Sequence, residues 1–168
     1  LPGPAFARRS LLLAGLGAAL STAPPASALP PRALQFPRDH GAHPDFRTEW
    51  WYITGQATAG GREFGFQVTF FRSRVDATQG LQSRFAARQL VFAHAAITDV
   101  QGKRLWHDQR IAREGFDVAS TATTDARLKL RDWTLGRDRD AWRTRIPAQE
   151  FDLNLAFAPT QPVLLQGR

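Results

Sequence analysis

The chain contains no cysteine among its 168 residues. Disulfides, thiol nucleophiles and cysteine metal sites are therefore excluded, and an apolar core must hold the domain together. After the N-terminal segment, the chain also lacks a glycine-rich phosphate loop and a serine in a nucleophile elbow. The motifs of nucleotide-binding enzymes and of serine hydrolases are therefore absent from the sequence. After the N-terminal segment, no apolar run is long enough to span a bilayer.

The charge is basic but dispersed. The sequence has 22 Lys+Arg against 15 Asp+Glu, a formal net charge of +7. These basic residues alternate with Asp, Thr and Gln along the chain, whereas a nucleic-acid-binding protein would more often concentrate them in one patch. The pattern therefore argues against a nucleic-acid partner.

The N-terminus has the features of an export signal. Arg8 and Arg9 precede an apolar run, Leu11 to Leu20, and "ASA" at residues 26–28 supplies a small-residue cleavage site. The paired arginines favour the twin-arginine route over the general secretory route. We therefore expect a cleaved signal peptide at 1–28, a Pro/Ala-rich leader and loop at 29–46, and a periplasmic or secreted domain at 47–168.

From about Arg47 onward, apolar and polar residues alternate with a period of two, which is the pattern of β-strands. In "REFGFQVTFFR", for example, Phe64, Phe66 and Phe70 share one face. The preceding "AGG" at residues 59–61 predicts a tight hairpin turn. We expect about eight short antiparallel strands and no clear helix, forming an up-and-down barrel or a sandwich. A barrel of that size can hold one small ligand.

The stretch "EWWYITGQ" at residues 49–56 is apolar on both faces of its predicted strand. Trp50 and Tyr52 point one way, and Trp51 and Ile53 the other. The strand is either a core strand beneath a flap, or one whose aromatic face lines a ligand cavity while the other face docks a second lobe. The residues expected to line such a cavity are Trp50, Trp51, Tyr52, Phe64, Phe66, Phe70, Phe92 and His94.

Few polar residues near these apolar stretches suit proton transfer. Glu49 and His94 are the candidate catalytic residues. Glu49 is also expected to form a structural salt bridge with an arginine, since Arg47 lies two residues away, and His94 to be a hydrogen-bonded core residue. Asp99 opens a predicted turn, where aspartate commonly caps the backbone.

The segment "DHGAHPD" at residues 39–45 brings two histidines and two aspartates close together. Such residues can bind a metal. In a Gly/Pro loop, however, the spacing favours a turn-rich plug whose side chains hydrogen-bond the rim of the barrel, and no metal site is predicted.

Several motifs, in order, resemble the carotenoid 1,2-hydratase and AttH-like family. They are "DHGAHPDFRTEWWYITGQ", "FGFQVTFFR", "FAHAAITD", "LKLRDWTL", "FDLNLAF" and "PVLLQG", from Asp39 to Gly167. The resemblance implies a lipocalin-like β-barrel corresponding to the N-terminal lobe of a two-lobe protein about twice as long.

The resemblance implies two alternative functions. Many family members are exported proteins encoded beside ABC-transporter permeases, which suggests a protein that binds an isoprenoid or lipid and serves a transporter. Others add water to the terminal double bond of acyclic carotenoids without a cofactor, which would make this chain a hydro-lyase. The export signal favours the first alternative.

Overall fold

The computed structural model describes residues 32–165 of the chain. The predicted signal peptide, residues 1–28, and the first part of the leader lie outside this range. The helices and strands of the described part all belong to the unit formed by residues 34–168. None of the helices in residues 32–165 is long and apolar enough to cross a membrane.

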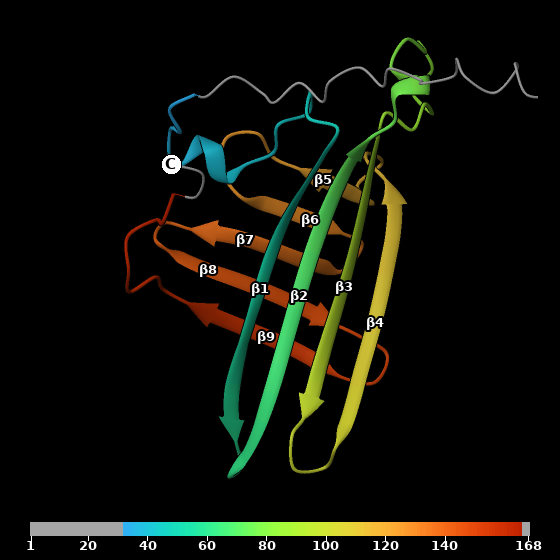
Figure 1. Cartoon of the computed structure of the whole chain (residues 1–168). Helices are drawn as coiled ribbons and strands as arrows, with labels where there is room; N and C mark the ends of the chain where they lie inside the picture. The colour runs from blue at the N-terminus through green and yellow to red at the C-terminus, as the bar shows by residue number, and fades with distance from the viewer. Residues whose placement is uncertain (1–31, 166–168) are drawn as a thin grey trace, which may run out of the picture. The chain divides into compact units, whose positions relative to one another are not determined.

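Two antiparallel sheets account for most of the described chain (Figure 1). The first contains β1 (Thr48–Ala59), β2 (Arg62–Arg74), β3 (Gln89–Asp99) and β4 (Arg104–Arg113) in that order. The second contains β5 (Ala119–Thr121), β6 (Arg127–Leu130), β7 (Trp133–Asp138), β8 (Ala141–Pro147) and β9 (Asp152–Phe157). The short 3₁₀ helices are η1 (Arg38–His40) and η2 (Asp76–Thr78).

The all-β antiparallel prediction is therefore confirmed, but the closed lipocalin-like barrel is not. The strand order leaves β1 and β9 as edge strands of their respective sheets. Figure 1 shows the strands of the second sheet running across those of the first. In the described residues the two sheets thus lie against each other as an open pair.

The β1–β2 hairpin follows directly from its sequence. Gly60 and Gly61 have φ values of 57° and 75°, the left-handed conformations that a two-residue hairpin turn requires. The turn sets a register that pairs Trp51 with Phe70 and Glu49 with Arg72. Alternation then divides each strand of the first sheet into an inner face, towards the second sheet, and an outer face.

The core lies between the inner faces of the two sheets. Phe70 and Val68 of β2 are fully buried, as are Leu130, Trp133 and Ile146 of the second sheet. Burying each such side chain contributes about 1.5–3 kcal/mol. Towards the β1–β2 turn the covering is thinner, because Phe64 and Phe66 on the same inner face are only half-buried. An apolar cavity lies at this thinly covered end of the inner face.

Candidate functional site

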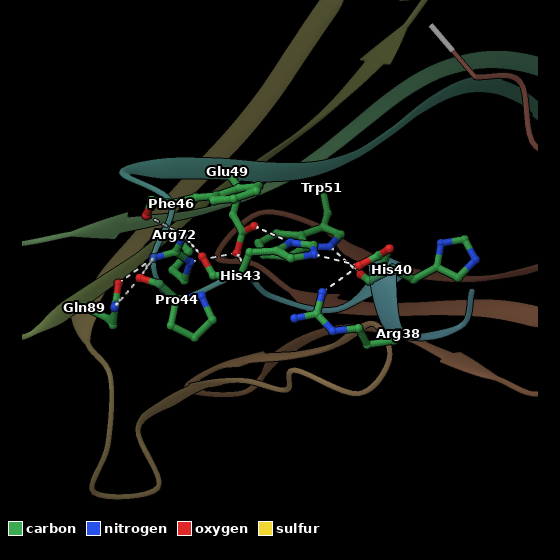
Figure 2. Close-up of polar contacts among 10 residues, drawn as sticks. Arg38, His40, His43, Pro44, Phe46, Glu49, Trp51, Arg72 and Gln89 are labelled. Carbon is green, nitrogen blue, oxygen red and sulfur yellow. Dashed lines mark hydrogen bonds and ion pairs between the residues drawn. The ribbon is translucent and has the colours of Figure 1, made fainter. Parts of the chain in front are cut away.

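A fully buried arginine organises the polar end of the first sheet. Arg72 of β2 lies directly opposite Glu49 of β1, and its Nε donates to Glu49 Oε1 at 2.8 Å. Its Nη1 donates to Gln89 Oε1 at 2.6 Å. Its Nη2 donates to the carbonyls of His43 and Phe46, each at 2.8 Å (Figure 2). The arginine thus joins β1, β2 and β3 to the segment that precedes β1.

That segment is the "DHGAHPD" loop, and its side chains continue the network. His43 places Nδ1 at 3.0 Å from Glu49 Oε2 and Nε2 at 3.0 Å from Asp39 Oδ1. The backbone N–H of His43 donates to Glu49 Oε1 at 2.7 Å. The indole N–H of Trp51 donates to the carbonyl of His40 at 2.8 Å. The loop is therefore hydrogen-bonded onto β1 and β2, as the plug interpretation predicted.

No group of three or more acidic or histidine side chains in residues 32–165 is arranged to hold a metal ion. The partner of Glu49 differs from the one suggested by the sequence, because it is Arg72 and not Arg47. The prediction of a structural salt bridge with an arginine is correct, but the arginine comes from the neighbouring strand β2. Asp99 caps its turn as expected, accepting from the Gly102 N–H at 2.9 Å, and it also pairs with Arg62.

Two apolar cavities open beside β1. The first, which we call the seam cavity, has a volume of about 400 Å³. It is lined by Trp51, Tyr52, Ile53, Thr54, Leu135, Trp142 and Phe157. The second, the distal cavity, has a volume of about 320 Å³ and lies nearer the β1–β2 turn. It is lined by Ala57, Ala59, Phe64, Phe66, Ile97, Trp106, Glu150, Phe151, Leu153 and Leu155.

The residues predicted to line one cavity are distributed over four places. Trp51 and Tyr52 line the seam cavity, and Phe64 and Phe66 line the distal cavity. Phe70 is fully buried in the core. Trp50, Phe92 and His94 lie on the outer face of the first sheet, because they share the strand faces that point away from the core.

His94 is therefore not a core residue, which corrects the expectation from its apolar strand. Its ring lies 5.5 Å from the Phe71 ring, and Nε2 lies 3.4 Å from Gln67 Nε2. Glu49 lies at the opposite surface of the same sheet, within the Arg72 network. The structure does not bring these two candidate catalytic residues together, and neither lines the seam cavity or the distal cavity.

Sequence reasoning missed the second sheet's contribution to the cavities. Trp142 of β8 and Phe157 of β9 line the seam cavity, with their rings stacked at 6.5 Å between centroids. Phe151, Leu153 and Leu155 line the distal cavity. These residues alternate with polar ones in "EFDLNLAF", which is typical of a strand with one inward face. Nothing in the sequence indicated which part of the first sheet that face would oppose.

The outer face of the first sheet is aromatic and exposed. One cross-strand row contains Trp50, Phe71, Phe92 and Ile111, and Tyr52 lies in the next row. Trp50, Tyr52 and Ile111 are 59%, 63% and 62% exposed. Among the outer-face positions of β1–β4, Glu63 beside the hairpin turn is the one carboxylate. This surface, the aromatic outer face, is thus nearly free of negative charge.

His40 lies beside the seam cavity, with its ring edge-on to Trp142 at 5.5 Å between centroids. Burial lowers the pKa of His40 below its ordinary value, and the Arg137 guanidinium acts in the same direction. Asp125 and Asp39 oppose the decrease without reversing it. The folded protein therefore favours the neutral imidazole of His40.

Replacing the buried arginine tests the role of the network. Arg72→Met leaves the Glu49 carboxylate without its strongest partner, so we expect the free energy of unfolding to decrease by about 3–5 kcal/mol. Urea denaturation measures this change. Arg104→Met, which removes an exposed pair with Glu150, should change stability by less than about 1 kcal/mol. A loss of less than about 1 kcal/mol in Arg72→Met would contradict the assigned role.

The lowered pKa of His40 predicts a dependence of stability on pH. As pH falls below about 6.5, the unfolded chain binds a proton that the folded His40 still excludes. Stability attributable to this group is therefore complete above that pH and decreases until the lower pKa of the folded state is reached. In denaturation experiments from pH 8 downward, His40→Gln should flatten this part of the profile. An unchanged slope, with stability at pH 8 as the internal reference, would rule out this contribution.

Comparisons with known proteins agree with this fold. The AttH-like family model matches residues 27–168. The chain is similar to a protein from Nitrosomonas europaea whose crystal structure was described as a candidate AttH. The two share 46% sequence identity, with a TM-score of 0.70. The match covers 83% of this chain and 42% of the Nitrosomonas chain, so this chain spans less than half the length of that relative. No match was found among curated proteins.

The family model and the solved relative together confirm the resemblance of the motifs between Asp39 and Gly167, and the chain belongs to the AttH-like family.

Proposed function

We propose that this protein binds an apolar or amphipathic small molecule, of the isoprenoid or lipid class, between its two sheets. The observation that carries the proposal is the lining of the distal cavity. Of the residues that line it, only Glu150 is charged, and its side chain is 62% exposed and paired with Arg104. Such a cavity offers a ligand apolar contacts and almost no polar recognition, which suits a hydrocarbon chain.

The magnitude of the hydrophobic effect is sufficient for this role. Each buried methylene contributes about 0.8 kcal/mol, so a chain of roughly ten methylenes gains on the order of 8 kcal/mol before the costs of association. Trp106 and Phe151 supply large apolar surfaces to the lining of the distal cavity. Specificity would then come from the shape and length of the distal cavity, because few polar groups are available to recognise a ligand.

No observation favours the alternative of carotenoid hydration. Glu49 Oε1 accepts from Arg72 and from the His43 backbone, and Oε2 pairs with the His43 ring. Its carboxylate is thus held as a structural acceptor. His94 lies on the outer face, away from both cavities. A proton donor for an alkene in either cavity would have to come from elsewhere.

The cellular setting of the proposal is supported by the sequence. The arginine pair at Arg8 and Arg9, the apolar run and the cleavage site support export to the periplasm or beyond. Service to an ABC-transporter permease is suggested only by the resemblance to exported family members. Within this proposal the protein would carry its ligand between compartments or deliver it to such a permease.

We further propose that the aromatic outer face packs against the additional polypeptide found in longer family members. The Nitrosomonas relative is more than twice as long as the segment matched, which supports such a partner. Trp50 and Tyr52 are large aromatic side chains that lie mostly exposed within one apolar patch. Their surroundings on β1–β4 carry almost no negative charge. A second lobe would remove this aromatic surface from water.

Blocking the distal cavity tests ligand binding. Ala57→Phe places a ring on the inner face of β1, within the cavity, whereas Gln56→Phe places the same ring on the outer face. Titration with dansylated undecanoic acid should show binding by the wild type and by Gln56→Phe. Ala57→Phe should weaken binding by roughly tenfold, because the ring displaces about two methylenes. Equal affinities of the two variants would place the probe outside the cavity.

Thiol labelling tests the outer-face partner, because the chain has no cysteine of its own. Tyr52→Cys should react rapidly with a maleimide in this chain. In a fusion with the unmatched part of the Nitrosomonas relative, the reaction should slow by at least about tenfold if that part covers the face. Asp140→Cys, in the β7–β8 turn, is the control and should react equally in both proteins. Equal labelling of Tyr52→Cys would exclude this partner surface.

A further inference from the structure

The seam cavity and the distal cavity lie along the same strands. On the inner face of β1, Trp51 and Ile53 line the seam cavity, and Ala57 and Ala59 line the distal cavity. β9 shows the same order on its inner face. Its Phe157 lines the seam cavity, whereas Leu153 and Leu155 line the distal cavity. Along β1 and along β9, the seam cavity is therefore followed by the distal cavity, and we call the two cavities together the groove.

Gly55 occupies the position on β1 between the two groups of lining residues. It has the extended backbone of the strand, so a left-handed conformation does not explain the glycine. The glycine is explained by the lack of room for a side chain at this position. A Cβ atom at Gly55 would lie 2.8 Å from Cζ of the Phe66 ring, closer than real Cβ contacts allow. The absence of a side chain therefore lets the Phe66 ring lie directly on the backbone of β1.

Phe66 is also the cross-strand partner of Gly55 and lines the distal cavity. Its ring thus stands where one cavity ends and the other begins. Trp51 to Ala59 spans roughly 26 Å at about 3.3 Å per residue, so Phe66 divides the groove into two halves of roughly 13 Å. With carbon–carbon bonds of about 1.5 Å, an extended hydrocarbon gains roughly 1.3 Å per methylene. Each half therefore accommodates about ten carbons.

We propose that Phe66, resting on Gly55, is the residue that sets the length of hydrocarbon chain that the groove accepts. A single linear chain of about ten carbons fills the distal cavity up to the ring. A longer chain gains further contact only where the ring is absent, because the seam cavity then becomes continuous with the distal one. This inference rests on the proposed function, since it specifies the ligand of the same groove.

The test compares affinities for saturated fatty acids of about 8 to 18 carbons, measured by displacement of dansylated undecanoic acid. Each buried methylene should increase affinity by about fourfold until the chain reaches Phe66, after which affinity should level off. Phe66→Ala should move this plateau to chains several carbons longer. Phe66→Leu keeps an apolar side chain at the position and should move it less, which provides a second measurement if the alanine variant folds poorly.

Phe64 provides the matched control. It lines the same distal cavity but lies opposite Ala57, away from Gly55. Phe64→Ala and Phe64→Leu should lower affinity at every chain length and leave the plateau at its wild-type position. A plateau that moves in the Phe66 variants alone supports the inference. A plateau that stays fixed in the Phe66 variants, or moves equally in the Phe64 variants, overturns it while ligand binding stands. Absence of fatty-acid binding by the wild type would instead overturn the proposed function.

Discussion

The ion pair between buried Arg72 and Glu49 is the interaction on which the rest of the site depends. A fully buried guanidinium is stable only if its N–H groups find acceptors, and here the acceptors come from two neighbouring strands, β1 and β3, and from the preceding loop. Satisfying Arg72 therefore fixes the loop over the end of the first sheet. The same loop accepts the indole N–H of Trp51 at the carbonyl of His40, which holds Trp51 where it lines the seam cavity.

The two apolar faces of "EWWYITGQ" serve different surroundings. Trp51 and Ile53 face the second sheet and form one wall of the groove. Trp50 and Tyr52 point away from the second sheet on the aromatic outer face, and Tyr52, on the edge strand, also borders the seam cavity. A strand that is apolar on both sides is unusual at the surface of a protein, and here it connects the proposed ligand groove with the proposed surface for a second lobe. A ligand in the groove and a second lobe on the outer face would therefore both contact β1.

Much of this arrangement could be predicted from local sequence. Alternation identified which phenylalanines of β2 share a face, and "AGG" identified the hairpin turn, because both patterns act over a few residues. The partner of Glu49 could not be predicted in the same way. Arg72 is 23 residues away, and the two meet only through the register set by the turn. Arg47 lies only two residues from Glu49 in the sequence, but it is not the partner in the salt bridge.

The composition of the cavities was harder to predict for a similar reason. Phe64, Phe66, Phe70 and Trp51 all lie on inner faces, as an apolar pocket requires. Which of them face a cavity and which are packed in the core depends on where the second sheet crosses the first. Phe70 lies beneath that sheet and is buried, whereas Phe66 lies nearer the turn and is not. No single-strand pattern carries information on that crossing.

The most direct measurement of the central claim is a crystal structure of the protein with a bromine-labelled fatty acid, in which anomalous scattering locates the ligand. We predict a bromine peak between the sheets, beside Ala57 and Phe66. A peak at Trp50 and Phe71 on the aromatic outer face, or no ordered bromine at all, would contradict a ligand groove between the two sheets.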